Sequence, residues 1–178
     1  MSKCIQVLLL GDTCATKMDM AYRFCGNIPS EEELAEDGIF CVQFDVSHNQ
    51  ELVTLKVTSI PEDPKYTRIL PPLFADCDVA VLCFSLKFPV SLQNLFSWDS
   101  QIQENVKTKI LVGNHSQEIL NEVVLNNLMK RGIEPVSAAE INDAEQRLGT
   151  KGTVFVESKL NLNLDKVFQL VTELGYKK

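Results

Sequence analysis

Short apolar runs separated by helix-length segments constrain the fold of this chain most strongly. The first run, CIQVLLL at Cys4–Leu10, is almost entirely apolar and ends at Gly11-Asp12, as a strand does when a parallel sheet buries both of its faces. Similar runs follow at Asp78–Phe84, Lys109–Gly113 and Thr153–Val156. Strands joined by helices of this length form a mostly parallel sheet through right-handed crossovers. The pattern therefore predicts an α/β fold.

A hairpin supplies the antiparallel pair of this sheet. Phe40–Val46 and Leu52–Val57 alternate apolar and polar residues on either side of the polar turn Ser47–Gln50. Helices are expected between the strands, and Trp98 on one of them is expected to pack in the core rather than to anchor a partner. The predicted helices are Met18–Cys25, Pro72–Ala75, Val90–Asn105, Ile119–Lys130, Ala138–Leu148 and Leu164–Leu174.

The composition limits the classes of function. The chain has 178 residues, and its 24 Asp and Glu exceed its 17 Lys and Arg, which gives a formal net charge of −7. An acidic chain is poorly suited to a phosphate backbone, so nucleic acid is not expected as a partner. The six cysteines lack the short paired spacings of zinc and redox sites. We expect them to be reduced and buried as small hydrophobic residues.

Signals for membrane attachment are not found in the sequence. No apolar stretch reaches the length of a membrane span, position 2 is Ser rather than Gly, and no prenylation cysteine stands near the last residue. We therefore expect a cytoplasmic protein without a lipid anchor, and a nuclear location is compatible with the same features.

A phosphate-binding motif follows the first strand. Residues 11–18, GDTCATKM, align with G-x-x-x-x-G-K-[ST] between a strand and a helix, which is where this motif occurs. In such motifs, backbone N–H groups and the lysine hold phosphate oxygens, and the hydroxyl binds magnesium. The alternative is a plain turn at Gly11-Asp12, with Lys17 as a solvated lysine at the start of the helix. We favour the plain turn with a solvated Lys17.

From this motif onward the chain resembles the small GTPases, and in its details the Rho branch of them. Ala80–Leu86 is similar to the fourth strand of Rho and Rac proteins, and residues 118–135 have the length and pattern of the helical insert of that branch. Glu157–Leu160 stands at the loop that completes the family's base site. The resemblance implies the three-layer P-loop small-GTPase fold as one domain over residues 1–178. That fold has a six-stranded, mostly parallel sheet, one antiparallel edge strand and helices on both faces.

The chain departs from this family at the positions that would hold phosphate and magnesium. Thr16 replaces the second glycine of the motif, which is unfavourable for a β-branched residue if its φ is positive. Met18 replaces the hydroxyl and cannot coordinate a hard cation. Because Gly11 and Lys17 remain, we interpret Gly11, Asp12, Thr16, Lys17 and Met18 as a vestigial phosphate loop.

The switch segments also lack the family's catalytic groups. Val57 would stand at the metal-linked aspartate, Ile60 at the glycine beside the γ-phosphate, and Pro61 at the glutamine that orients water. Ala35 would stand at the switch threonine, within the acidic stretch 31–37. The resemblance therefore implies neither a catalytic residue nor a metal site, and we expect no enzymatic activity.

The base-reading motif is altered as well. Gln117, a neutral amide, takes the place of the carboxylate that binds guanine. We interpret Asn114, His115, Gln117 and Ser158 as vestigial base-reading positions, with His115 and Ser158 as structural loop residues. If four such losses each cost about 1.5–2 kcal/mol, they remove about 6–8 kcal/mol together, or on the order of 10⁴–10⁶ in affinity.

These substitutions favour a Rho-like pseudoGTPase that binds no cofactor and acts as a protein-interaction module in signalling or in a larger complex. Its protein partners would contact segments 30–40 and 60–73 or the insert 118–135. One alternative is a residual or constitutive guanine-nucleotide-binding protein of the Rho family, which holds GTP or GDP weakly through Gly11 and Lys17 without well-bound magnesium. Another is an active GTPase with other residues in the catalytic roles.

Overall fold

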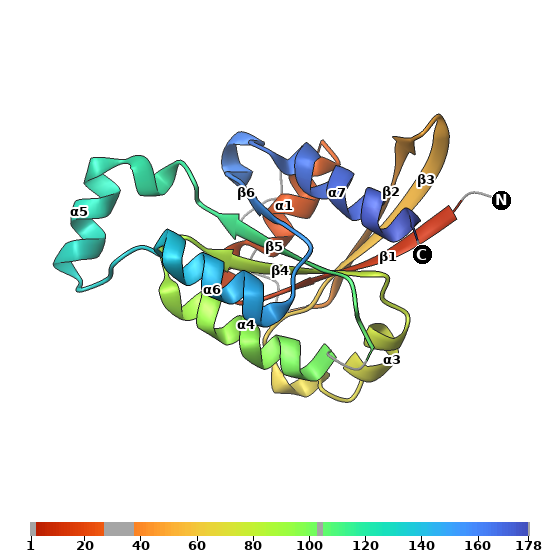
Figure 1. Cartoon of the computed structure of the whole chain (residues 1–178), viewed down its shortest axis with the longest axis horizontal. Coiled ribbons are helices and arrows are strands. Elements are labelled where there is room, and N and C mark those ends of the chain that lie inside the picture. The colour runs from red at the N-terminus through yellow and green to blue at the C-terminus, as the bar shows by residue number, and fades with distance from the viewer. Residues whose placement is uncertain (1–2, 27–37, 103–104, 178) are drawn as a thin grey trace.

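One six-stranded sheet forms the centre of the computed structural model, which describes residues 3–26, 38–102 and 105–177 (Figure 1). The strand order is β2-β3-β1-β4-β5-β6. β2 and β3 are antiparallel, and all other neighbours are parallel. The strands are β1 (Lys3–Leu10), β2 (Phe40–His48), β3 (Glu51–Ser59), β4 (Val79–Ser85), β5 (Lys109–Asn114) and β6 (Thr153–Phe155). The predicted mixed α/β sheet is confirmed.

Helices cover both faces of this sheet (Figure 1). α1 and α7 pack on one face around Phe168, and α3, α4 and α6 pack on the other around Phe84. The helices are α1 (Lys17–Phe24), α3 (Leu70–Ala75), α4 (Pro89–Ile102), α5 (Glu122–Lys130), α6 (Ala138–Leu148) and α7 (Leu164–Tyr176). Short 3₁₀ turns occur at η1 (Thr13–Ala15), η2 (Pro64–Tyr66), η3 (Glu118–Leu120) and η4 (Ser158–Leu160).

The parallel strands bring their carboxyl ends to one edge of the sheet. All seven residues of β4 and all six of β5 are buried, because helices cover both faces there. Ser85, the last residue of β4, pairs with Asn114, the last residue of β5. The loops that follow β1, β3, β4 and β5 therefore meet at this edge, where ligands bind in open α/β sheets.

The structure corrects the predicted end of the third strand. β3 does not stop at Val57, because Ser59 pairs with Leu9 of β1 and the N–H of Ile60 donates to the Leu9 carbonyl at 3.2 Å. The polar Thr58 and Ser59 are buried in the strand. The functional loop consequently begins at Ile60 rather than directly after Val57.

The predicted helix over Ile119–Lys130 is interrupted. Asn121 has an extended backbone (φ −85°, ψ 118°) between η3 and α5, and its side chain accepts the N–H of Val123 at 2.9 Å. This cap ends the 3₁₀ turn and starts α5. The predicted insert region 118–135 consists of η3, α5 and the loop that follows, and α5 projects from the end of the molecule (Figure 1).

The burial of Trp98 agrees with the sequence prediction, whereas the exposure of several cysteines does not. Trp98 is 7% exposed within the core under α4, as predicted. All six cysteines are free, but only Cys77 and Cys83 are buried. Cys41 is exposed on β2, the edge strand of the sheet, and Cys4 is exposed near the start of β1, before the pairing with β4 begins at Val7. Within the described ranges, none of the helices combines the length and the apolar character needed to span a bilayer.

Candidate functional site

The phosphate loop, residues 11–18, follows β1 and crosses the backbone of β4. Gly11 has φ 131°, and a Cβ atom on it would lie 2.0 Å from the carbonyl oxygen of Cys83. No side chain fits at that distance, and L residues rarely adopt that conformation. Gly11 is therefore required by the packing of the loop on β4, whatever the loop binds.

Some backbone N–H groups of the loop form hydrogen bonds within the loop itself. It forms the 3₁₀ turn η1, in which Ala15 N–H donates to the Asp12 carbonyl and Thr16 N–H to the Thr13 carbonyl, both at 3.0 Å. Thr16 has φ 53° and ψ 48°, the left-handed conformation that is unfavourable for a β-branched residue by about 1–2 kcal/mol. Its hydroxyl oxygen accepts the side-chain amide of Asn114 at 2.6 Å. Tertiary contacts thus hold Thr16 in this conformation.

Lys17 is buried, which contradicts the prediction of a solvated lysine. Its side chain is folded back against the loop, where the ammonium group donates to the carbonyl of Gly11. Burial lowers the pKa of Lys17, and the nearby carboxylates of Glu62 and Asp12 act against that shift. The prediction failed because the lysine side chain turns inward onto the Gly11 carbonyl instead of extending outward from the start of α1. Met18, beside it, is half-buried.

Two acidic side chains lie near the loop. Asp12 is 7% exposed, and its Oδ2 accepts the side-chain amide of Asn94 from α4 at 2.8 Å. Glu62, from the segment after β3, is an exposed residue whose carboxyl group lies near Asp12 and Thr13. Burial and the adjacent Asp12 raise the pKa of Glu62 to about 7. The sequence interpretation missed Glu62, although a carboxylate so close to the end of β3 was a visible signal.

The predicted positions of the family's second switch motif lie at the end of β3 and just after it. By the resemblance, D-x-x-G-Q is held by Val57-Thr58-Ser59-Ile60-Pro61. Val57 is fully buried inside β3, where it pairs with Val7, and Ile60 is fully buried as well. Farther along the segment, Asp63 forms a 2.8 Å ion pair with Lys65.

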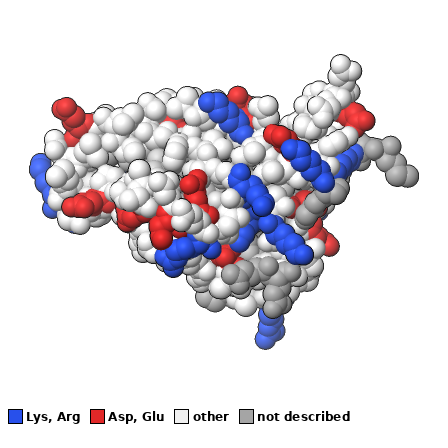
Figure 2. All heavy atoms as spheres, in the orientation of Figure 1, with Lys and Arg blue, Asp and Glu red and all other residues white. Residues whose placement is uncertain are grey.

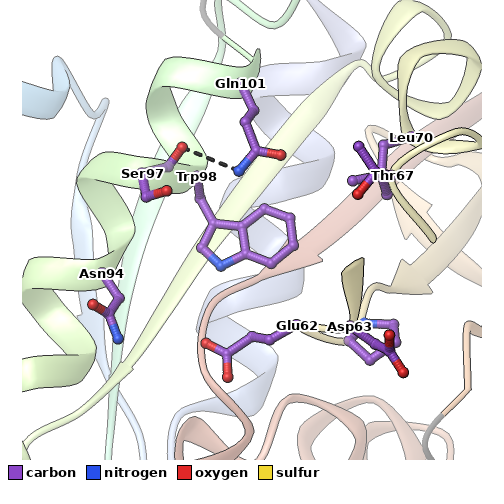
Figure 3. Close-up of a pocket in the computed structure, with 9 residues that line it drawn as sticks. Glu62, Asp63, Thr67, Leu70, Asn94, Ser97, Trp98 and Gln101 are labelled. Atoms are coloured by element: carbon purple, nitrogen blue, oxygen red, sulfur yellow. Dashed lines mark hydrogen bonds between the residues drawn. The ribbon is translucent and has the colours of Figure 1, made fainter. Parts of the chain in front are cut away.

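A pocket of about 310 Å³ lies between this segment and α4 (Figure 3). Its lining includes Glu62, Asn94, Trp98 and Leu70. Figure 3 shows the Glu62 side chain extending along the floor of this pocket toward the side on which Asn94 lies. Across residues 3–26, 38–102 and 105–177, no three His, Cys, Asp or Glu side chains are grouped to hold a metal ion.

The base-reading loop is tied to the phosphate loop by Asn114. Its side-chain NH₂ donates to the Ala15 carbonyl and to Ser158 Oγ, both at 3.1 Å, in addition to Thr16. Its side-chain oxygen accepts the N–H groups of His115 (2.8 Å) and Ser158 (3.1 Å). Asn114 and Ser158 are fully buried or nearly so. The structure thus brings together three of the four predicted base-reading positions.

His115 serves this loop as a buried, neutral side chain. Its Nδ1 lies 2.8 Å from Ser85 Oγ, and it is 4% exposed. Burial, followed by the positive charge of Lys87, lowers its pKa to about 4. The imidazole is therefore uncharged at neutral pH, which agrees with a structural loop residue.

Gln117 lies apart from these three side chains. It is exposed, and its backbone N–H donates to Glu157 Oε2 at 3.1 Å. Glu157 is 2% exposed and also accepts the N–H of Glu118 at 3.3 Å. Its buried carboxylate thus holds the backbone of the base-reading loop in place. Sequence reasoning assigned no role to Glu157, because its partners are backbone groups that no side-chain pattern reveals.

The first predicted contact segment falls largely outside the described residues. Glu31–Glu33, Leu34 and Ala35 all belong to residues 27–37, and only 38–40 of segment 30–40 are described. On the face in view, Figure 2 shows lysine, arginine and acidic side chains interspersed over the described surface.

The fold and the motif positions agree with a comparison against known protein families. The model of the Ras family matches residues 6–176, which covers the sheet from the first strand to the last helix. The position of the phosphate loop after β1 and of the base-reading loop after β5 is consistent with this match. The chain therefore belongs to the Ras family.

Proposed function

We propose that this Ras-family domain is a Rho-like pseudoGTPase that has lost GTP hydrolysis and nucleotide binding and acts as a protein-interaction module. The observation that carries the proposal is the internal use of the phosphate loop. Ala15 and Thr16 N–H groups close a 3₁₀ turn, and the carboxyl groups of Asp12 and Glu62 lie near the loop. A triphosphate would have to open this turn and face both carboxyl groups.

The residues that survive from the motif do not require a nucleotide. Gly11 is the residue that allows the loop to pass Cys83, and Lys17 hydrogen-bonds the Gly11 carbonyl. Asn114 holds three loops together through its side-chain amide. Each of these residues has a folding role, so their retention gives no preference to the alternative of a residual GTP-binding protein.

The residues at the motif positions also disfavour magnesium binding and GTP hydrolysis. Met18 offers only a thioether where a hard cation needs oxygen. Val57 stands where the family has its metal-linked carboxylate, and Pro61, at the glutamine position, lacks the amide that orients water. The residues present do not fit a magnesium–nucleotide complex, and we assign no catalytic residue.

Protein partners are proposed at two described surfaces. Segment 60–73 lies beside α4, and the insert 118–135 projects beyond the sheet (Figure 1). Leu128 is the buried residue of α5, whereas apolar side chains of the insert remain largely exposed to solvent: Leu120 (70%), Val123 (68%) and Met129 (66%). Such exposed apolar residues are typical of a surface that contacts another protein.

Restoring the motif tests the proposal. The double variant Thr16→Gly with Met18→Thr regains the glycine and the hydroxyl, but Val57, Ile60 and Gln117 still differ from the residues that contact magnesium, the γ-phosphate and the base in the family. We expect no GTP binding up to several hundred micromolar in a fluorescent-nucleotide titration with magnesium, with the wild-type chain as the matched control. Micromolar affinity in the double variant would contradict a loss that is distributed over several positions.

A further inference from the structure

The loop that follows α5 turns back toward the sheet through a fixed set of hydrogen bonds. The N–H of Gly132 donates to the Met129 carbonyl and the N–H of Ile133 donates to the Leu128 carbonyl, both at 2.9 Å. Gly132 has φ 70°, so these two bonds form the Schellman motif that ends many helices. The motif closes α5 and sets the direction of the loop, which returns to the start of α6 (Figure 1).

The far end of this loop is joined to the body of the domain. Val136 is 7% exposed within the core, and its N–H donates to the Leu86 carbonyl just after β4 at 2.9 Å. Directly after it, Ser137 and Glu140 form a capping box at the start of α6. Hydrogen bonds thus hold both ends of the loop before any partner binds, and a preformed surface loses little conformational freedom on binding.

A pocket of about 670 Å³ lies between this loop and the first turns of α4 and α6. Its volume is within the range of pockets that hold ligands. The described part of the chain leaves Val90, at the start of α4, 60% exposed in this pocket. The apolar side chains that line it are Phe88, Pro89, Val90, Ile133 and Pro135. The pocket therefore offers apolar surface that a binding partner could cover.

The charged residues that line this pocket are both acidic: Glu134 and Glu140. In the part of the chain that the structure describes, neither carboxylate forms an ion pair. Glu140 accepts the N–H and the hydroxyl of Ser137 with one of its oxygens, whereas Glu134 is exposed. Lys87 does not line the pocket and is paired with Glu118 at 2.5 Å. The lining thus has an excess of negative charge.

Other charges near the pocket do not reverse its sign. The first turns of α4 and α6 each carry a partial positive charge of about half a unit, and the two full charges of the carboxylates exceed their sum. Lys130 and Arg131 stand at the end of α5, but both are exposed and neither lines the pocket. A cation of a partner is therefore favoured over an anion at this surface.

We propose that this pocket docks a segment of a partner protein in which a lysine or arginine adjoins bulky apolar side chains. The apolar side chains of the segment cover Val90 and Ile133, and its cation pairs with Glu134. A second copy of this chain is a poorer occupant, because two chains with a formal net charge of −7 repel each other. The docking site rests on the proposed function, since it gives the chemistry of a partner that binds beside the insert 118–135.

A peptide titration of the full ¹⁵N-labelled chain tests the docking site. The probe is the peptide Gly-Leu-Arg-Leu-Arg-Leu-Gly with both ends blocked, and two control peptides replace its arginines with glutamate or its leucines with serine. We expect amide signals in residues 87–92 and 132–140 to shift with a dissociation constant of about 0.1–1 mM. Each control peptide should bind at least about tenfold more weakly, because it lacks either the cation or the apolar side chains.

Matched substitutions locate the two kinds of contact. Glu134→Gln removes the exposed charge without altering the cap of α6 and should weaken binding about three- to fivefold. Glu122→Gln removes an exposed acid of α5 outside the pocket and should leave binding unchanged. Val90→Thr should weaken binding about threefold, whereas Val123→Thr, on the similarly exposed Val123 of α5, should have no effect.

The opposite results are distinct for the docking site and for the proposed function. Equal binding of the three peptides, no binding of the probe at millimolar concentration, or unchanged binding in Glu134→Gln and Val90→Thr would overturn the docking site. Shifts of the same amide signals on raising the concentration of the chain alone would assign the pocket to a second copy and overturn it as well. Guanine nucleotide released from the purified sample on denaturation would contradict the proposed function instead, because the titration reports on the pocket directly.

Discussion

Replacing Gly11 with alanine tests whether the phosphate loop is retained for folding. The new Cβ atom would lie 2.0 Å from the carbonyl oxygen of Cys83, so loop or strand must move by more than an ångström. Overpacking of this kind costs about 1–3 kcal/mol, and the φ of 131° adds about 1–3 kcal/mol for a residue other than glycine. We therefore expect Gly11→Ala to lower the free energy of unfolding by about 3–5 kcal/mol.

Gly149→Ala is the matched control for this variant. Gly149 also has a positive φ, 65°, but a Cβ atom on it would meet nothing within 4 Å, so the change tests backbone strain alone. Its expected cost is about 1 kcal/mol. The assay is urea unfolding of both variants and the wild-type chain, with the midpoints compared at a common slope. Equal destabilisation by the two substitutions would refute the close approach of Gly11 to β4 and the folding role assigned to it.

Three further substitutions test other parts of the account. Because the pKa of His115 is lowered to about 4, the folded chain should lose up to about 3 kcal/mol of stability as the pH falls from 6.5 to 4. Unfolding curves of His115→Asn should lack this loss. An equal loss in both chains would contradict the lowered pKa. Asn114→Ala removes the amide that joins three loops and should lower the unfolding free energy by about 2–4 kcal/mol in urea; a change below 1 kcal/mol would contradict that role. Lys109→Met removes the cation paired with the buried carboxylate of Asp99 and should lower the free energy of unfolding by about 3–5 kcal/mol, measured by thermal unfolding. Adding Asp99→Leu should recover at least half of this loss. No recovery would contradict the pairing.

The fold was predictable because its strongest signals are local. The apolar runs at Cys4–Leu10 and Asp78–Phe84 are long enough to identify buried strands, and the helix-length segments between strands determine the parallel topology. The errors occur where a polar residue has a tertiary role. Thr58 and Ser59 extend β3 because β1 and β2 pair with them, and Asn121 interrupts a helix because its side chain caps the next one.

The sequence located the residues of the site but not the contacts between them. The motif spacing located Gly11, Thr16 and Lys17, and the conformation of Thr16 followed from the glycine that it replaces. The burial of Lys17 depends on its side chain folding back onto the Gly11 carbonyl, which the motif does not encode. Glu62 lies near Asp12 although the two are distant in sequence, so only the three-dimensional arrangement reveals their proximity.

The nucleotide content of the purified chain tests the central claim most directly. The protein is purified without added nucleotide and denatured, and the released GDP and GTP are quantified by chromatography against the protein concentration. The internal use of the phosphate loop predicts no guanine nucleotide, together with no signal in a fluorescent-nucleotide titration up to high micromolar concentration. Near-stoichiometric GDP or GTP would contradict the account and would establish the loop as a working phosphate site.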